Sequence, residues 1–277
     1  MLINTEGIVL RQSKIANNRR IITLFTRRYG KITAGTSINE RAKGRAALAI
    51  RPFTYAEYDI FKGRNYFNIN NADVKKSYYS IGEDIDRYMV ASKLLEYIDK
   101  TTEEEQLRPR LFDLSIEFME SITNAKGSYM TLLYAFVVKS LSLNGVMPEI
   151  KQCVSCGKSL SDIRKEGNGK VKYFSVTGGG ILCEDCYTRL DAQDVSLIFK
   201  PDFDIVEVLD YFAKKPLSSF EKVSLKPAVS NGLQRILSEY LKYYLDVDIF
   251  DNDIIATDWN SLVTVIEVVI IKSQTNW

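Results

Sequence analysis

The sequence contains no histidine among its 277 residues. This absence excludes the Ser-His-Asp and Cys-His catalytic arrangements and the metallohydrolase motifs that depend on histidine ligands. The sequence also lacks a GxxxxGK[ST] phosphate-binding loop and a GxGxxG motif. Carboxylates, lysine and tyrosine can still perform acid–base chemistry, so the expectation of an enzyme is lowered without being removed.

Long apolar runs are missing as well. No stretch of eighteen apolar residues occurs, so we expect no transmembrane helix and no membrane partner. Residues 1–6 lack the basic and then apolar layout of a signal peptide. We therefore expect a soluble cytoplasmic protein, associated with the nucleoid if it binds DNA. Its length is typical of roughly two or three domains.

Charge is distributed unevenly along the chain. Residues 1–80 carry fifteen Lys and Arg against five Asp and Glu, a net charge of +10. The whole chain carries only +2, so residues 81–277 have a net charge of −8. Such asymmetry is typical of nucleic-acid binding, although a solvated basic surface without a partner would give the same count.

The basic part is rich in short alternating and β-branched runs. They predict five strands, at residues 6–14, 19–28, 31–38, 53–61 and 66–69. The parity of the aromatic and apolar residues changes between Tyr55 and Tyr58, which predicts a β-bulge near Ala56 and Glu57. Five short strands without a long helix favour a small closed barrel, and the five-stranded OB fold is the natural candidate.

Basic side chains fall at the predicted strand ends and turns and in the loop 39–51, where they reach solvent. OB barrels bind single strands through a basic groove and aromatic stacking platforms, without reading sequence. We predict phosphate contacts from Arg11, Lys14, Arg19, Arg20, Arg27, Arg28, Lys31, Arg41, Lys43, Arg45, Lys62 and Arg64.

Four tyrosines of this part are candidate stacking platforms: Tyr29, Tyr55, Tyr58 and Tyr66. A barrel of this size needs most of its aromatic side chains for its core, so burial is the stronger expectation for each of them.

Apolar residues recur at helical spacing in residues 81–100, 107–122, 129–143 and 202–215, and again from about residue 228. Ser-x-x-Glu patterns at Ser80 and Ser218 predict capping boxes at helix starts. Segment 129–143 is apolar on nearly every side, which predicts a buried central helix.

We therefore expect four parts: an OB barrel in residues 1–80, a helical domain formed by 81–150 and 191–250, an inserted module in 151–190, and a tail, 251–277. The apolar run 262–271 within that tail has no functional interpretation from the sequence.

All four cysteines fall in the inserted module, as C-x2-C, twenty-six residues, C-x2-C: Cys153, Cys156, Cys183 and Cys186. Two such pairs complete a tetrahedral four-thiolate site, which zinc favours and hard cations do not. Disulfides, a redox dithiol and an iron–sulfur cluster are the weaker alternatives. We predict a structural Zn²⁺, because four protein ligands leave no position for a catalytic water.

Several motifs together resemble a known family. They are RYGK at 28–31, RPF at 51–53, GR at 63–64, and CVSCG followed by GGGILCEDC. Over roughly residues 1–245 the chain resembles the RecO family of bacterial recombination and repair mediators. The resemblance implies an α+β multidomain protein, in which an N-terminal OB-fold β-barrel precedes an α-helical domain with a zinc-binding insert.

The same resemblance implies what such a protein does. It implies binding of single- and double-stranded DNA and annealing of complementary strands. It also implies work with RecR to load RecA onto DNA coated by the single-stranded-DNA-binding protein. A non-enzymatic DNA-binding mediator is therefore our first hypothesis.

Two other functions stay open at this point. One is a zinc-ribbon module that binds RNA or protein without annealing, although residues 153–186 carry a net charge of only +1. The other is a nuclease that uses paired carboxylates and a divalent metal. The D-x-D pairs start at residues 84, 202, 246 and 251, and helix starts and an acidic tail explain them better.

Overall fold

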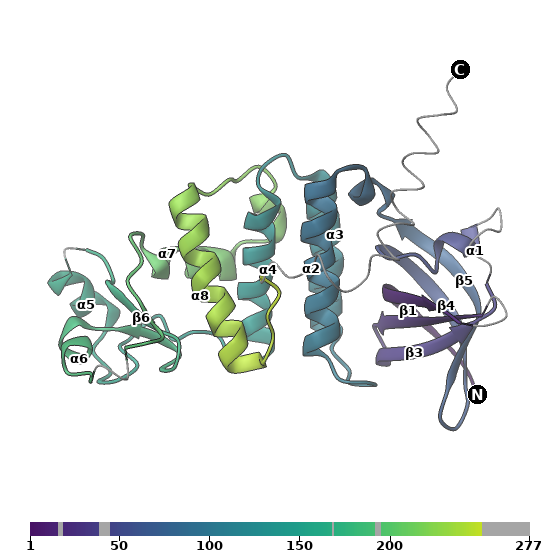
Figure 1. The fold of residues 1–277 in the computed structure, drawn as a ribbon, viewed down its shortest axis with the longest axis horizontal. Helices are drawn as coiled ribbons and strands as arrows, with labels where there is room; N and C mark the ends of the chain where they lie inside the picture. The colour runs from purple at the N-terminus through teal and green to yellow at the C-terminus, as the bar shows by residue number, and fades with distance from the viewer. Residues whose placement is uncertain (16–18, 39–44, 168, 192–194, 251–277) are drawn as a thin grey trace, which may run out of the picture.

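The computed structural model describes residues 1–15, 19–38, 45–167, 169–191 and 195–250. A small β-barrel lies at one end of the molecule, a group of helices in the middle, and the cysteine-containing module at the other end (Figure 1). The tail 251–277 and the predicted phosphate ligands Arg41 and Lys43 lie outside the described residues.

Five strands close the barrel in the order β1-β2-β3-β5-β4. All neighbours are antiparallel except β3 and β5, which are parallel. The alternating side chains that point inward form a core of residues such as Val9, Ile22 and Leu24, so the predicted OB-like barrel is confirmed. The strands are β1 (Leu2–Lys14), β2 (Arg20–Thr26), β3 (Gly30–Thr36), β4 (Thr54–Lys62) and β5 (Phe67–Ser77).

Two details of the barrel concern the predictions. The pairing of β4 with β5 shifts register between Tyr55 and Ala56, next to the predicted bulge. Strand β5 continues to Ser77, well beyond the predicted end at Ile69, because its pairing with β4 outweighs the weak strand propensity of its asparagines.

The segment predicted as a basic loop, residues 39–51, contains a short helix, α1 (Arg45–Leu48). Ala49 and Ile50, which follow it, are fully buried in the barrel core. The hydroxyl of Tyr58 donates a hydrogen bond of 2.6 Å to the carbonyl of Ala49. Ala49 and Ile50 therefore close one end of the barrel, because burial in its core removes their apolar side chains from water.

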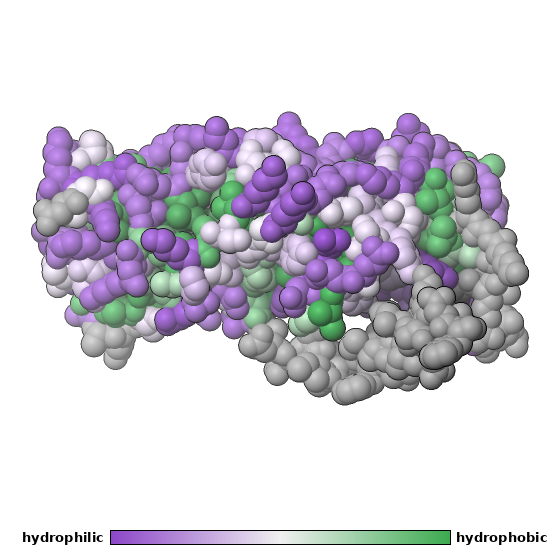
Figure 2. Space-filling model, turned by 90° about the horizontal axis from the view of Figure 1, so that it is seen from above, coloured by the Kyte–Doolittle hydropathy of each residue, from purple (hydrophilic) through white to green (hydrophobic). Residues whose placement is uncertain are grey.

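Helix α4 is the centre of the helical domain. It packs against α2, α3, α7 and α8, and ten of its fifteen residues are buried, so the predicted central helix is confirmed. The outer surface seen in Figure 2 is largely hydrophilic, with smaller apolar areas between the polar side chains. The helices are η1 (Tyr79–Glu83), α2 (Ile85–Thr101), α3 (Pro109–Asn124), α4 (Tyr129–Leu143), α7 (Ile205–Lys214), η2 (Leu217–Phe220) and α8 (Pro227–Leu245).

Both predicted capping boxes are wrong. Ser80 lies inside the 3-10 helix η1, and Ser218 lies inside η2. Helix α2 begins later, with Asp84 as its N-cap, whose carboxylate accepts a hydrogen bond of 2.8 Å from the backbone N–H of Arg87. Asp and Ser are comparable N-caps, but the Asp84 carboxylate also interacts favourably with the positive end of the helix dipole. The 3-10 turn before it buries Ile81.

The cysteine-containing module is a small unit packed on α8. Its sheet has the order β7-β6-β8. The Tyr244 hydroxyl of α8 donates a hydrogen bond to the carbonyl of Thr177, and the rings of Phe174 and Tyr240 lie 6.1 Å apart. The elements are α5 (Leu160–Glu166), β6 (Tyr173–Ser175), β7 (Gly180–Leu182), α6 (Glu184–Thr188) and β8 (Ile198–Phe199).

The core of the helical domain extends onto the barrel, whose interior forms a second core of its own. Phe25 of β2 meets Phe112 of α3 with 5.7 Å between ring centroids, and Phe53 meets Tyr88 of α2 at 5.5 Å. These contacts fix the orientation of the barrel relative to the helices.

Among the described residues, none of the helices combines the length and apolar character needed to cross a bilayer.

Gly30 marks the closest approach at this junction. It adopts a φ of +67°, and a Cβ there would lie 2.1 Å from the carbonyl oxygen of Gln106. We expect Gly30→Ala to lower the free energy of unfolding by about 3 kcal/mol, because backbone strain and a backbone clash add. Urea denaturation measures this change.

Gly145→Ala provides the matched control, since Gly145 has a φ of +73° with nothing within 4 Å of the added Cβ. It should cost only the strain of the left-handed conformation, about 1 kcal/mol. Equal losses in the two variants would contradict a close contact at Gly30.

Candidate nucleic-acid interface and metal centre

An open groove of about 840 Å³ crosses the outer face of the barrel. Thr33, Ala34 and Gly35 of β3 form part of its surface, together with Asn68 and Asn70 of β5. The β1–β2 connection borders one side, and the β4–β5 hairpin borders the other. This is the strand 2–3 face between the two loops with which OB folds commonly bind oligonucleotides.

Two of the predicted cations, Arg19 and Arg20, line this groove. Lys14 is paired with Arg20 in the β1–β2 register, and Arg64 lies in the β4–β5 hairpin that borders the groove. Lys14, Arg19 and Arg64 are exposed, and Arg20 donates to the side-chain oxygen of Gln12 at 3.2 Å. The fold thus gathers these four residues around one opening.

Three other predicted cations face the helical domain instead. Arg11 and Lys31 both pair with the carboxylate of Asp99, at 3.3 and 3.2 Å. Arg27 pairs with Glu6 at 2.8 Å and also with Asp113 of α3. These side chains hold the barrel to the helices, because the end of the barrel at the β2–β3 turn packs on α2 and α3.

The remaining predicted cations have separate positions. Lys62 pairs with Glu105, and its ammonium lies 5.0 Å from the centroid of the Phe67 ring. Arg28 is exposed in the β2–β3 turn. Arg45 begins α1. The sequence could not separate these residues from the groove set, because every one of them lies near a strand end or a turn.

One of the four candidate platforms, Tyr66, lines the groove and is 59% exposed. Phe61 and Phe67 also line it, and sequence reasoning missed both, although they flank the hairpin turn at Gly63. The rings of Phe61 and Tyr66 lie 6.0 Å apart. The groove therefore has an aromatic border opposite its arginines.

The other three platforms are not in the groove. Tyr58 is fully buried in the barrel core. Tyr55 packs against Phe112, and burial together with the Glu6 carboxylate raises the pKa of Tyr55 to about 12. Tyr29 is half-buried next to the barrel core. Core packing explains these three tyrosines.

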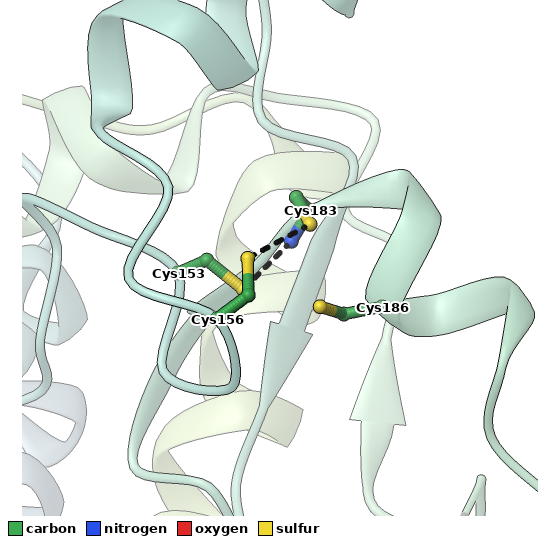
Figure 3. A group of neighbouring side chains, drawn as sticks. All are labelled: Cys153, Cys156, Cys183 and Cys186. Carbon is green, nitrogen blue, oxygen red and sulfur yellow. Dashed lines mark hydrogen bonds between the residues drawn. The ribbon is translucent and has the colours of Figure 1, made fainter.

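The four cysteines converge at the far end of the molecule. Cys153 and Cys156 come from one loop, Cys183 from the start of α6 and Cys186 from within it (Figure 3). Their sulfur atoms all lie within 4.8 Å of one another, and those of Cys156 and Cys183 are 3.7 Å apart.

This geometry fits a tetrahedral metal site. Metal–sulfur bonds of about 2.3 Å in a tetrahedron place the sulfurs about 3.8 Å apart, close to the separations seen. Gly157, with a φ of +75°, allows the tight turn after the first pair, and its N–H donates to the carbonyl of Cys153. The cluster can therefore bind one thiophilic metal ion.

The surroundings act differently on the individual thiols. Burial of Cys153 opposes its ionisation, but hydrogen bonds from the backbone N–H groups of Cys183, Cys156 and Ser155 lower the pKa of its thiol to about 7. Burial raises the pKa of Cys183 to about 12. A bound cation would favour the thiolate form of all four cysteines.

Lys158 joins the two helices of this module. Its ammonium pairs with Asp185 of α6 at 2.8 Å and with Glu166 of α5 at 2.9 Å. Hydrogen bonds to these carboxylates raise the pKa of Lys158. Because Lys158 follows the loop that carries Cys153 and Cys156, its ion pair with Asp185 links this loop to α6, which carries Cys186.

The basic and aromatic groove on an OB-like barrel, the helices and the four-cysteine cluster are features of OB-fold proteins that can bind nucleic acid and a metal ion. Comparison with known proteins narrows this class. Residues 1–78 match the family described as Recombination protein O N terminal, and residues 82–249 match Recombination protein O C terminal. The chain belongs to the RecO family of DNA repair and recombination proteins.

Individual relatives agree with this assignment. The chain is 30% identical to the DNA repair protein RecO of Alkaliphilus metalliredigens, over 89% of this chain and 95% of that protein. It is 31% identical to RecO of Caldanaerobacter subterraneus subsp. tengcongensis, over 91% and 96%. The predicted family is confirmed. The prediction of a non-enzymatic recombination mediator is confirmed with it.

The metal centre leads to a direct test. We expect the purified protein to hold about one metal ion per chain, because four thiolates fill a tetrahedral site. Cys156→Ser should remove the metal without opening the core, since Cys156 is exposed. Elemental analysis of the protein by mass spectrometry measures the metal content.

Ser155→Ala, in the same turn, is the control and should keep the metal. Full metal content in Cys156→Ser would contradict a four-cysteine site.

Proposed function

We propose that this protein binds single- and double-stranded DNA in the barrel groove and anneals complementary strands. We further propose that it works with RecR to load RecA onto DNA coated by the single-stranded-DNA-binding protein. Membership of the RecO family supports both proposals. The observation that carries them is a groove with arginines on one side and exposed aromatic rings on the other.

Each side of the groove suits one part of a DNA strand. Arg19 and Arg20 can neutralise phosphates and release counterions, which gives affinity without sequence preference. Tyr66 and Phe61 present ring faces on which bases of any identity can stack. Because the groove is open, a bound strand keeps bases accessible for pairing, which is what annealing requires.

We therefore centre the DNA surface on Lys14, Arg19, Arg20 and Arg64. Arg28 and the predicted residues of segment 39–45, namely Arg41, Lys43 and Arg45, remain in the proposal as additional phosphate contacts. Arg11, Arg27, Lys31 and Lys62 leave it, because they do not line the groove and they pair with carboxylates of the helical domain.

We propose that the metal is Zn²⁺ with a structural role. The ligands are Cys153, Cys156, Cys183 and Cys186, and an all-thiolate tetrahedral set is typical of structural zinc. When bound, the ion links the loop before α5 to helix α6. We assign residues 1–80 to the barrel, 81–150 and 191–250 to the helical domain, and 151–190 to the zinc module.

The groove arginines provide the main test. At physiological salt we expect Arg19→Gln/Arg20→Gln to weaken DNA binding on the order of tenfold or more, equally for different sequences. The dependence of log K on log salt should become shallower by up to about two, because up to two phosphate contacts are lost. Fluorescence anisotropy with labelled oligonucleotides in the full-length protein measures both quantities.

Arg11→Gln/Arg110→Gln removes the same charge elsewhere and serves as the control. Arg11 faces the helical domain and Arg110 lies exposed at the start of α3. If the groove variant binds no more weakly than this control, the groove is not the DNA site.

The aromatic border gives a second test. Tyr66→Ala should weaken binding to single strands about fivefold or more, since stacking contributes about 1–3 kcal/mol per base. Binding to duplex DNA should change little, because paired bases cannot stack on the ring. Tyr79→Ala, a change of another half-exposed tyrosine outside the groove, is the control. Equal effects on single strands and duplex would contradict stacking.

A further inference from the structure

The connection that follows α2 lies beside the groove, outside its lining residues, and we call this connection the wall. After α2 the chain passes along β3, where Glu104 forms a parallel bridge with Lys31. The N–H of Glu105 donates to the carbonyl of Lys31 at 2.8 Å. This connection, residues 103–106, extends the barrel surface at the part of β3 that β5 does not cover, since β5 pairs with β3 only from Ala34 onward.

Two carboxylates of this connection reach groove residues. Glu104 accepts a hydrogen bond of 3.0 Å from the hydroxyl of Thr33, which lines the groove. Glu105 pairs with Lys62, whose ammonium lies over the ring of Phe67, another lining residue. Both glutamates are exposed. Glu104 is bonded to a neutral hydroxyl and keeps its charge, whereas the charge of Glu105 is balanced by Lys62.

The groove is therefore polarised across its width. Arg19 and Arg20 lie at the β1–β2 connection, while Glu104 and Glu105 lie at the side of the helical domain. A phosphate near the Glu104 carboxylate would be repelled within the screening length, about 8 Å at physiological salt. A phosphate near the arginines would be attracted.

We propose that Glu104 and Glu105 position the bound DNA strand and limit its affinity, an inference that rests on the proposed DNA binding. The Glu104 charge directs the phosphates toward Arg19 and Arg20, which leaves the bases toward Tyr66 and Phe61. Glu105 also occupies Lys62, so this cation is withheld from the DNA. The bound strand stays exchangeable, as a protein that anneals strands requires.

Glutamine substitutions isolate charge from structure. A glutamine oxygen at position 104 can still accept from Thr33, and one at 105 can still accept from Lys62. The backbone bond from residue 105 to Lys31 does not involve the side chain. Glu104→Gln/Glu105→Gln therefore removes two negative charges while the connection keeps its hydrogen bonds.

The experiment compares full-length variants by anisotropy with a labelled oligo-dT strand over a series of salt concentrations. We expect Glu104→Gln/Glu105→Gln to bind about three- to tenfold more tightly at physiological salt. The slope of log K against log salt should steepen by about one, because Lys62 becomes available to a phosphate. Adding Lys62→Gln to this variant should reverse the change in slope.

Glu83→Gln/Asp86→Asn is the matched control, with the same change in net charge at two exposed carboxylates near the start of α2, outside the wall. It should alter the dissociation constant less than twofold. Unchanged affinity in the wall variant, or equal tightening in the control, would overturn the inference. A gain in affinity cannot result from misfolding, so a folding defect cannot imitate the expected result.

The groove variant Arg19→Gln/Arg20→Gln separates the two proposals. If it loses DNA binding while the wall variant stays at the wild-type affinity, only the role of Glu104 and Glu105 is refuted. If it binds DNA as tightly as the wild-type protein, the proposed DNA site itself fails.

Discussion

The contact between the barrel and helices α2 and α3 is the constraint on which the rest of the structure depends. Phe25 and Phe53 extend the helical core into the barrel, and ion pairs from Arg27 and Lys31 surround this contact. Apolar burial supplies most of the stabilisation of such a contact, while partly exposed ion pairs add little. The contact determines which face of the barrel stays open, and the groove lies on that face.

The same contact changes the meaning of the charge asymmetry. Part of the basic excess of residues 1–80 is neutralised by acidic residues of the following helices, such as Asp99 and Asp113. The net charge of +10 therefore overstates the field available to DNA. Arg19 and Arg20 lie together in the groove, where basic side chains and aromatic rings meet.

The four-cysteine centre is remote from the barrel groove. It lies at the opposite end of the molecule from the barrel (Figure 1), too far away to take part in DNA chemistry in the groove. Its module is small, with strands of two or three residues. Its apolar side chains, such as Phe174 and Ile181, belong to the core of the helical domain. A metal ion bound by the thiols would add stabilisation where the two C-x2-C segments meet.

The sequence by itself determined the elements whose patterns are local. Strand alternation indicated the barrel, continuous apolarity indicated the buried helix α4, and two C-x2-C pairs indicated the metal centre. Tertiary structure alone decided which cations pair with carboxylates of the helices, because Lys31 and Asp99 are 68 residues apart and Arg27 and Asp113 are 86 apart. It also placed Glu104 and Glu105 beside the groove. A charge count depends only on composition, whereas the pairing of charges depends on distances that the folded core sets.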